Sequence, residues 1–276
     1  MPLARTAMAT RFEAVLVGRD AAQLRAAGER ALEEVAVWED LLSPYLHGSW
    51  ISRLNQGAEV APVAVPAEVF GFLIRCMALW RETDGAFDPT VGPLMEAWGL
   101  RGGPESGGET RAFAAASVGM EGVILDAAAR TVTFTRPGMA LDVGAVAKGW
   151  ALDCAAETIR ESGAATGFLL HGGTSTVIAA GRDEEDLPWR VGVASPADPE
   201  AVQGTVELVD RALSVSAPHG RVSETGHPHV MDPRSGRPAV ACPLAVVTAH
   251  DATTADAHST ALLVAGGDQP ARLDLA

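Results

Sequence analysis

The segment DATTADAHSTALL, residues 251–263, carries two oxygen-bearing side chains with the spacing of a metal site. Asp256 and Thr260 are four residues apart, so on a helix they share one face, about one turn apart. A carboxylate, a hydroxyl, a backbone carbonyl and phosphate oxygens together suit Mg²⁺, which usually binds few protein ligands plus phosphates and water. The alternative is structural, because an acidic residue near a helix start often compensates the helix dipole and threonine is tolerated in a helix.

The segment LDVGAVAKGWALD, residues 141–153, has the pattern of an anion-binding helix start. A predicted strand ends in the carboxylate of Asp142, Gly144 permits a tight turn, and a helix begins directly afterwards. Lys148 lies near the first turn of this helix, where a cation opposes the helix dipole and so needs another reason to be present. A bound phosphate supplies such a reason, and a surface lysine on an amphipathic helix is the equally simple alternative.

The segment GHPHVMDPRSGRPA, residues 226–239, offers a general base. Histidine has an ordinary pKa of about 6.5 and is mostly neutral at cellular pH, so His229 is a candidate to accept a proton. Zinc binding by His227 and His229 is disfavoured because no third ligand follows at a recognisable spacing. Alternatively the segment is a structural turn, in which Asp232 caps the backbone and pairs with Arg234.

Two further segments have the character of ligand-lining loops. Residues 85–99, GAFDPTVGPLMEAWG, place glycines and prolines among apolar residues, a mixture too rigid for a helix and too apolar for a solvated loop. Tyr45 is the only tyrosine of the chain and lies in the loop LLSPYLHGS. Its ring offers a stacking face to a planar ligand, although the commoner role of such a residue is to anchor its loop to the core.

The net charge limits the classes of ligand. The 276 residues include 21 Lys and Arg against 35 Asp and Glu, which gives a net charge of −14 and a pI near 4.9. Such a protein does not work by neutralising nucleic-acid phosphates or anionic lipid, because both need a positive field at contact. A phosphate-containing ligand would therefore require local positive charge from helix N-termini, a few basic side chains or a metal ion.

The cysteines and the N-terminus bear on location. Cys76, Cys154 and Cys242 are odd in number and fit no disulfide framework or zinc pattern. The N-terminus has no apolar core of signal-peptide length and no early cysteine for lipid attachment, and the chain has no apolar run long enough to span a membrane. We therefore expect a cytoplasmic protein with no membrane anchor in this chain, exported only if a leader has been removed.

Hydrophobic periodicity predicts the elements that must position these groups. Helices are predicted over about 20–42, 67–83, 145–160 and 252–265. Strands are predicted at 11–17, 139–143 and 244–249, with a hairpin over 122–136 and several short strands within 167–216. The loops 101–110 and 181–188 are expected to be solvated surface excursions. Hairpins mixed with three or four helices predict an α+β fold.

Taken together, six segments resemble the FAD:protein FMN transferase family, the ApbE-like flavin transferases. They are Met8-Ala9-Thr10, Ser43-Pro44-Tyr45 with Ser52-Arg53-Leu54-Asn55, and residues 85–94, 141–153, 229–239 and 251–262. One such segment would be weak evidence, whereas six in the order of the family are strong. The resemblance implies a single flavin transferase domain over residues 1–276. Its fold would be α+β, with flavin in a cleft between two mixed α/β halves.

The resemblance also implies a set of site residues. It assigns FAD contacts to Met8, Tyr45, Ala86, Phe87, Asp88, Asp142, Lys148 and Val230, with His229 close by. It assigns Mg²⁺ ligation to the backbone carbonyl of Ala145 and to the side chains of Asp256 and Thr260. These metal ligands coincide with the oxygen pair inferred from spacing, and Lys148 gains a phosphate partner.

The implied reaction transfers the FMN moiety of FAD to a Ser or Thr hydroxyl of an acceptor flavoprotein and releases AMP. In this interpretation His229 is the candidate base, and Asp256 acts through Mg²⁺. One alternative is a Mg²⁺-dependent FAD pyrophosphatase, in which water attacks and releases FMN and AMP. Another is a noncatalytic flavin-binding protein, which the Asp256 and Thr260 pair argues against because storage requires no metal.

Three positions depart from the pattern of the family. Ala9 stands where glycine is usual, Thr174 where Asp or Asn is frequent, and Ala217 where glycine is usual. The last two lie near the expected approach of the acceptor, so they concern the choice of acceptor more than the binding of FAD.

Overall fold

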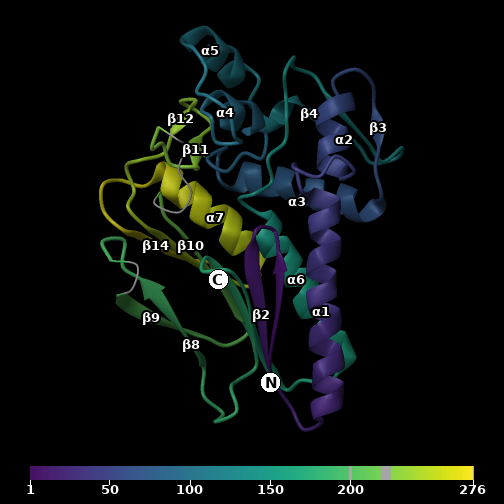
Figure 1. The fold of residues 1–276 in the computed structure, drawn as a ribbon, viewed down its shortest axis with the longest axis vertical. Coiled ribbons are helices and arrows are strands. Elements are labelled where there is room, and N and C mark those ends of the chain that lie inside the picture. The colour runs from purple at the N-terminus through teal and green to yellow at the C-terminus, as the bar shows by residue number, and fades with distance from the viewer. Residues whose placement is uncertain (199–200, 219–224, 276) are drawn as a thin grey trace.

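A seven-stranded sheet forms the centre of the protein (Figure 1). The computed structural model describes residues 1–198, 201–218 and 225–275. The strand order is β1-β2-β6-β7-β10-β13-β14, and neighbours are antiparallel except for β13 and β14, which are parallel. The strands are β1 Pro2–Ala7, β2 Thr10–Val17, β6 Gly167–Gly172, β7 Thr176–Ala180, β10 Arg211–Ser216, β13 Ala245–Ala249 and β14 Ala271–Asp274.

Three helices cover one face of this sheet. They are α1 Ala21–Leu42, α6 Ala147–Ser162 and α7 Ala252–Ala265, and α6 packs against both of the others. Side chains alternate between the two faces of a strand, so Phe12, Ala14 and Leu16 of β2 all point into the core beneath the helices. This core is continuous from the first hairpin to α7.

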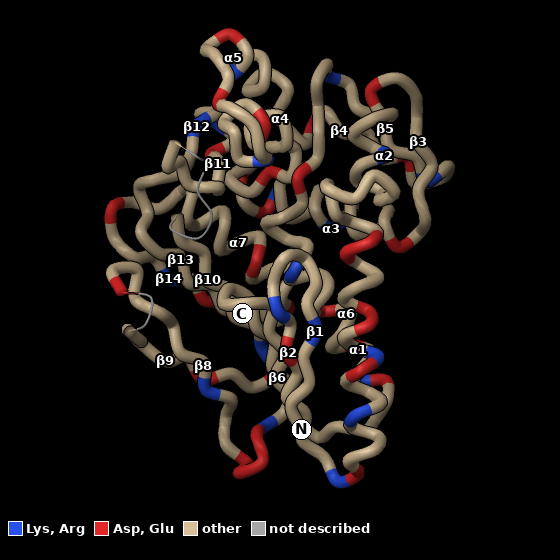
Figure 2. The backbone as a smooth tube through the Cα atoms, in the orientation of Figure 1, with Lys and Arg blue, Asp and Glu red and all other residues tan. Residues whose placement is uncertain are grey.

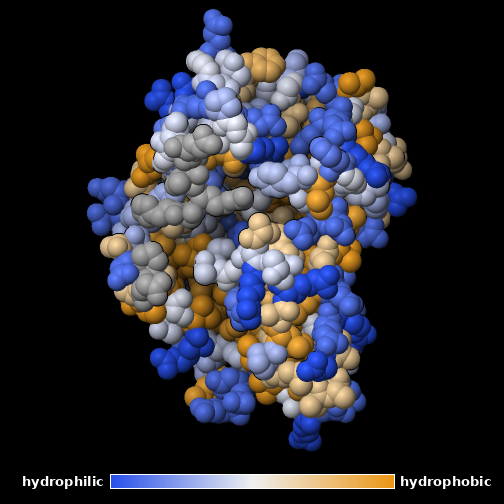
Figure 3. All heavy atoms as spheres, viewed as in Figure 1, coloured by the Kyte–Doolittle hydropathy of each residue, from blue (hydrophilic) through white to orange (hydrophobic). Residues whose placement is uncertain are grey.

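A hairpin covers part of the opposite face of the sheet. It consists of β8 Trp189–Ala194 and β9 Val202–Leu208. Trp189 and Leu208 of the hairpin join Val177 and Leu213 of the sheet in a second apolar cluster. Figure 3 shows hydrophobic side chains gathered beside this hairpin. The sheet is therefore apolar on both faces, as expected for the central layer of a fold with three layers.

The remaining elements form the upper half of the molecule in Figure 1. A three-stranded sheet has the order β3-β5-β4, and β11 pairs with β12. The bounds are α2 Trp50–Gly57, β3 Val63–Ala64, α3 Ala67–Glu82, α4 Gly92–Ala97, α5 Gly108–Ala116, the 3₁₀ turn Met120–Gly122, β4 Val123–Asp126, β5 Thr131–Phe134, β11 Met231–Asp232 and β12 Arg237–Pro238. The mixed α and β architecture is the predicted one.

The strongly periodic segments form the predicted elements. Helices α1, α3 and α7 lie within the predicted bounds, and α6 begins two residues later than expected, at Ala147. The strand predicted at 139–143 is wrong, because only Ala140 forms a bridge, to Val91. The amide of Leu141 donates instead to the side chain of Asn55, and that of Asp142 donates to the carbonyl of Pro89. Backbone groups are satisfied there without a ladder.

Two predicted loops contain helices. The segment 85–99 was expected to be too rigid for a helix, yet α4 forms within it, with Pro93 in its first turn. Proline is tolerated there because the first N–H groups of a helix have no intrahelical partner. Helix α5 likewise begins inside the expected excursion 101–110, and the side chain of Arg101 is only 11% exposed.

The charged residues are distributed along the chain without a basic stripe. Figure 2 shows basic positions only in the first half of α1, whereas acidic positions continue to its end. In the described part of the chain, no helix has the length and apolar character needed to cross a bilayer. All three cysteines are unpaired, as predicted.

Candidate functional site

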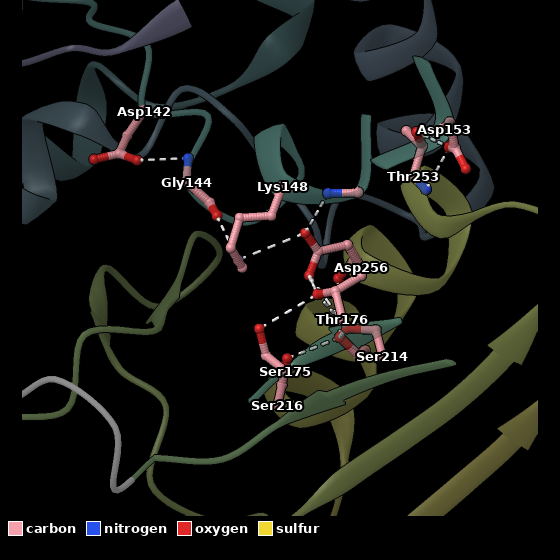
Figure 4. Close-up of polar contacts among 12 residues, drawn as sticks. Asp142, Gly144, Lys148, Asp153, Ser175, Thr176, Ser214, Ser216, Thr253 and Asp256 are labelled. Atoms are coloured by element: carbon pink, nitrogen blue, oxygen red, sulfur yellow. Dashed lines mark hydrogen bonds and ion pairs between the residues drawn. The ribbon is translucent and has the colours of Figure 1, made fainter. Parts of the chain in front are cut away.

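The carboxylate of Asp256 is the centre of the candidate site (Figure 4). The residue lies on α7 and is 3% exposed. Its Oδ1 accepts hydrogen bonds from the hydroxyls of Thr176 at 3.0 Å and Ser214 at 3.2 Å. Its Oδ2 accepts from the amide of Gly149 at 3.1 Å and lies 3.6 Å from Nζ of Lys148. These contacts satisfy a charge that would otherwise be costly to bury.

A chain of hydroxyl groups extends from this carboxylate. The Oγ atoms of Ser214 and Ser259 are 3.0 Å apart, and those of Ser259 and Ser216 are 2.8 Å apart. Ser259 also donates to the backbone carbonyl of Asp256 at 2.9 Å. The hydroxyls therefore hold both the side chain and the backbone of Asp256, and they fix the carboxylate in one orientation.

Strand geometry explains why the hydroxyls meet Asp256. In β10, Ser214 and Ser216 are in phase with buried Ala212, and in β7 Thr176 is in phase with buried Ile178. Side chains two residues apart share a face of a strand, so these polar groups point toward α7. These three residues were not predicted as part of the site, although a hydroxyl on the inward face of an apolar strand is a usable signal.

The start of α6 supplies backbone and cationic groups. Oδ1 of Asp142 accepts from the amide of Gly144 at 3.0 Å, and Nζ of Lys148 lies 3.4 Å from the carbonyl oxygen of Gly144. No side chain caps the helix, which begins after Val146. The amide of Gly149 bonds to Asp256 of α7 instead. The predicted strand end is absent and the tight turn is present, whereas the binding of an external anion at this helix start remains a prediction.

The 141–144 turn is clamped by two side chains. Arg101 donates through Nε and Nη2 to Oδ2 of Asp142, at 3.2 and 2.9 Å, and through Nη2 to the carbonyl of Leu141 at 3.1 Å. Asn55 donates to the same carbonyl at 3.0 Å and accepts from the amide of Leu141 at 2.7 Å. Arg101 was not predicted, because its partner lies 41 residues away in sequence.

Asp88 is buried, and its carboxylate is used in hydrogen bonds within the protein. Its carboxylate accepts from the amide and the hydroxyl of Thr90, at 2.8 and 2.5 Å, and from the amide of Met120 at 3.1 Å. Burial raises the pKa of Asp88 above its ordinary range, and these hydrogen bonds oppose that rise. The side chains of Ala86 and Phe87 are also buried in the core. A flavin contact by these residues would therefore use backbone atoms.

Other predicted flavin contacts lie on separate segments. Met8 and Ala9 form the β1–β2 turn with positive φ angles of 49° and 56°, a region in which glycine is favoured. Tyr45 is 55% exposed in the loop after α1, whereas Val230 is buried with the C-terminal part of α7. Their contacts with flavin remain predictions.

The segment that carries His229 is held by residues of the α4–α5 region. Nε2 of His227 lies 3.6 Å from Oε2 of Glu105, and its ring is 4.9 Å from that of Trp98. The structural alternative for Asp232 is present, since its Oδ1 accepts from the amide and from Nε of Arg234 at 3.1 and 3.2 Å. The role of His229 as a base remains a prediction.

The donor set around Asp256 fits a hard divalent cation. It combines a carboxylate, hydroxyls and, on the far side of Lys148, the carbonyl of Gly144, which are the kinds of oxygen that Mg²⁺ prefers. The described residues hold no cluster of three His, Cys, Asp or Glu side chains suited to a metal, and Mg²⁺ usually needs fewer. The ammonium of Lys148 lies beside Oδ2 on a flexible side chain, so a positive charge is already accommodated at this oxygen.

Comparison with known proteins assigns the fold to a family. A model of the ApbE family matches residues 8–274. The chain belongs to the ApbE family. Two relatives named FAD:protein FMN transferase are each 30% identical to it. The Vibrio cholerae relative aligns over 91% of this chain and 75% of its own length, and the Escherichia coli K12 relative over 95% and 77%.

Solved structures agree with the family assignment. The ApbE protein of Thermotoga maritima has a TM-score of 0.86 and 27% identity to this ApbE-family protein, covering 96% of this chain and 86% of its own. The flavin transferase ApbE of Vibrio cholerae has a TM-score of 0.81 and 27% identity over the same shares. The resemblance stated from six sequence segments is therefore confirmed, as is the fold class.

A surface depression of this ApbE-family protein lies apart from the predicted contacts. It has a volume of about 360 Å³ beside the start of α7. Its lining residues are Arg75, Trp150, Asp153, Cys154, Glu157, Arg160, Ile178, His250, Asp251 and Thr253, which include no predicted flavin or metal residue. Size alone does not locate the chemistry here, and the convergence of polar groups on Asp256 is the better guide.

Proposed function

We propose that this protein transfers the FMN moiety of FAD to a Ser or Thr hydroxyl of an acceptor protein and releases AMP. The observation that carries the proposal is the convergence of the α6 start, Lys148 and buried Asp256. This arrangement joins an anion-accepting helix start to a carboxylate suited to a cation. The relatives named FAD:protein FMN transferase support the same reaction.

Lys148 and the start of α6 bind the diphosphate of FAD in this proposal. The amides of Ala147 and Gly149 donate to the carbonyl of Val143 and to Asp256, so the start of α6 contributes mainly the positive end of its helix dipole. Nζ of Lys148 reaches toward the same turn. A protein of net charge −14 needs this local concentration of positive groups to hold a dinucleotide.

Asp256, Thr260 and the carbonyl of Ala145 would hold Mg²⁺, which when bound neutralises charge on the phosphoryl oxygens. Thr176 and Ser214 keep the Asp256 carboxylate oriented by donating to its Oδ1. The amide of Gly149 fixes Oδ2 against the helix start. These contacts remove the need to reorganise the carboxylate during the reaction.

The chemical step is an in-line displacement at the FMN-side phosphorus. The acceptor hydroxyl oxygen forms a bond to phosphorus, the bond from phosphorus to the AMP oxygen breaks, and AMP leaves. His229 accepts the proton of the attacking hydroxyl in this proposal. His229 directly precedes buried Val230, whose carbonyl accepts a hydrogen bond from the amide of Ala239 at 2.8 Å.

Mass spectrometry tests the proposed reaction. The protein is incubated with FAD, Mg²⁺ and a candidate acceptor, together with the same acceptor carrying alanine at its Ser or Thr. We expect an FMN phosphoester on the first acceptor, none on the second, and one AMP released for each FMN attached. Free FMN in place of the adduct would establish the pyrophosphatase, and intact FAD would establish a noncatalytic flavin-binding protein.

A further inference from the structure

Arg101 forms a largely buried ion pair with Asp142 at the candidate site. Its side chain and that of Asp142 are each 11% exposed. The guanidinium meets Oδ2 of Asp142 with two N–H groups and the carbonyl of Leu141 with one. Its other carboxylate neighbour, Glu96, is 65% exposed and 3.5 Å away. Arg101 therefore contacts mainly the carbonyl of Leu141 and the carboxylate of Asp142.

The contacts of Arg101 continue into the site. Asp142, held at Oδ2 by Arg101, accepts at Oδ1 from the amide of Gly144, and the carbonyl of Gly144 faces Nζ of Lys148. Lys148 in turn faces Asp256. An uninterrupted series of polar contacts thus runs from Arg101 to the carboxylate proposed to hold the cation. Figure 4 shows its inner part, from Asp142 to Asp256.

Arginine is suited to this position for two reasons. Its planar guanidinium offers several N–H donors in fixed directions, so it can hold a carboxylate and a carbonyl together. It also stays charged at every relevant pH, so it cancels the charge of Asp142 beside the turn where the diphosphate is proposed to bind. An unpaired Asp142 would repel the phosphates of FAD.

We propose that Arg101 is a positioning residue for flavin transfer. It fixes the 141–144 turn in the shape that presents Lys148 and the α6 start to the diphosphate, and it neutralises Asp142. This inference rests on the proposed function for its kinetic part, whereas its structural part concerns the turn alone. Arg101 acts through Asp142 and touches no reacting atom.

Hydrogen exchange tests the structural part without any ligand. We expect Arg101→Gln to raise the exchange rates of amides in residues 142–148 by about tenfold or more, because a charge-assisted clamp is lost. Glu96→Gln is the control, since it removes the exposed neighbour and leaves the Asp142 pair intact. Asp142→Asn removes the same pair from the other side and replaces Arg101→Gln if that variant fails to fold. Unchanged exchange in residues 142–148 would overturn the proposal, whether or not FAD is the substrate.

A double-mutant cycle tests the functional part. Flavin fluorescence gives the affinity for FAD, and transfer kinetics give kcat and KM. Arg101→Gln is expected to raise the KM for FAD about tenfold with a smaller fall in kcat, because it disturbs binding geometry and leaves the reacting groups in place. In the Asp142→Asn background the same change should alter FAD affinity less than about twofold. Additive effects of the two substitutions would show that Arg101 does not act through Asp142.

Discussion

Nζ of Lys148 lies between Oδ2 of Asp256, at 3.6 Å, and the carbonyl oxygen of Gly144, at 3.4 Å. The ammonium therefore joins the turn before α6 to a carboxylate on α7. Lys148 is also the only lysine among the 21 Lys and Arg residues of the chain. The lysine ammonium is a compact charge on a flexible side chain, so it can contact a phosphate from several directions, whereas a planar guanidinium binds in fixed directions.

This uniqueness makes Lys148 a spectroscopic probe. Reductive methylation with ¹³C formaldehyde should give one lysine signal besides that of the N-terminal amine. We expect this signal to shift on addition of Mg²⁺ and to shift again on addition of FAD, because both change the charge near Nζ. Lys148→Gln should lose the signal and raise the KM for FAD by about tenfold. A signal unmoved by saturating FAD would contradict a phosphate contact.

Replacing Asp256 by Asn should reduce turnover that depends on Mg²⁺ by about a hundredfold or more, since a neutral amide oxygen binds Mg²⁺ more weakly than a carboxylate does. Isothermal titration with Mg²⁺ should show weakened binding by the same variant. Asp251→Asn is the matched control on the same helix, where asparagine preserves the N-cap contact to Thr254. Equal activity of the wild type and Asp256→Asn would exclude Asp256 as a ligand.

Gly149 marks the closest approach of α6 to α7. A Cβ added there would lie 2.4 Å from the carbonyl oxygen of Ala252. Gly149→Ala should therefore separate the helices, lower the free energy of unfolding by about 1–3 kcal/mol and weaken Mg²⁺ binding through Asp256. Gly71 of α3 has open space around its Cβ position, so Gly71→Ala should stabilise the protein by up to about 1 kcal/mol. Urea denaturation compares the two, and equal effects would contradict the tight crossing.

The stability of the protein should depend on Asp153. Its carboxylate accepts from the amides of Ala252 and Thr253, both at 2.8 Å, yet burial raises its pKa from 3.8 to about 6. A pKa raised in the folded chain adds stability that is complete below about pH 4 and is lost as the pH rises through about 6. Relative to Asp153→Asn, the wild type should lose about 3 kcal/mol of unfolding free energy between pH 3.5 and 7.

Urea titrations of the wild type and Asp153→Asn at a series of pH values measure this difference. Asp183→Asn, in the loop 181–188, is the control for a general effect of removing a carboxylate. Parallel stability curves for the wild type and Asp153→Asn would contradict a raised pKa for Asp153.

Local patterns predicted the long helices well, because their apolar residues repeat at the spacing of a helix face. Residues 252–265 became α7 without change, and Gly163 ends α6 in the left-handed conformation. Residues 139–143 have the composition of a strand but do not form one, because their backbone bonds to Asn55 and Pro89. A side chain 86 residues away leaves no mark on local periodicity.

The site was predicted only where its residues lie in short motifs. Asp142, Lys148 and Asp256 were selected from their own segments, and the structure brings them into one series of contacts. Thr176 and Ser214 were missed because they come from separate strands, 80 and 42 residues from Asp256. Their importance depends on which strand faces lie beneath α7, and that is decided by the fold as a whole.

The amide of Gly149 donates to the carboxylate of Asp256. The hydroxyls of Thr176 and Ser214 donate to the same carboxylate, and that of Ser259 donates to the Asp256 carbonyl. For the amide proton of Gly149 to be replaced by deuterium, α6 must part from α7, and that parting also exposes the interior. The slowest-exchanging amide of the site should thus report global unfolding. A substitution that loosens the contact between α6 and α7 would then reduce catalysis and shorten the lifetime of the native state at the same time.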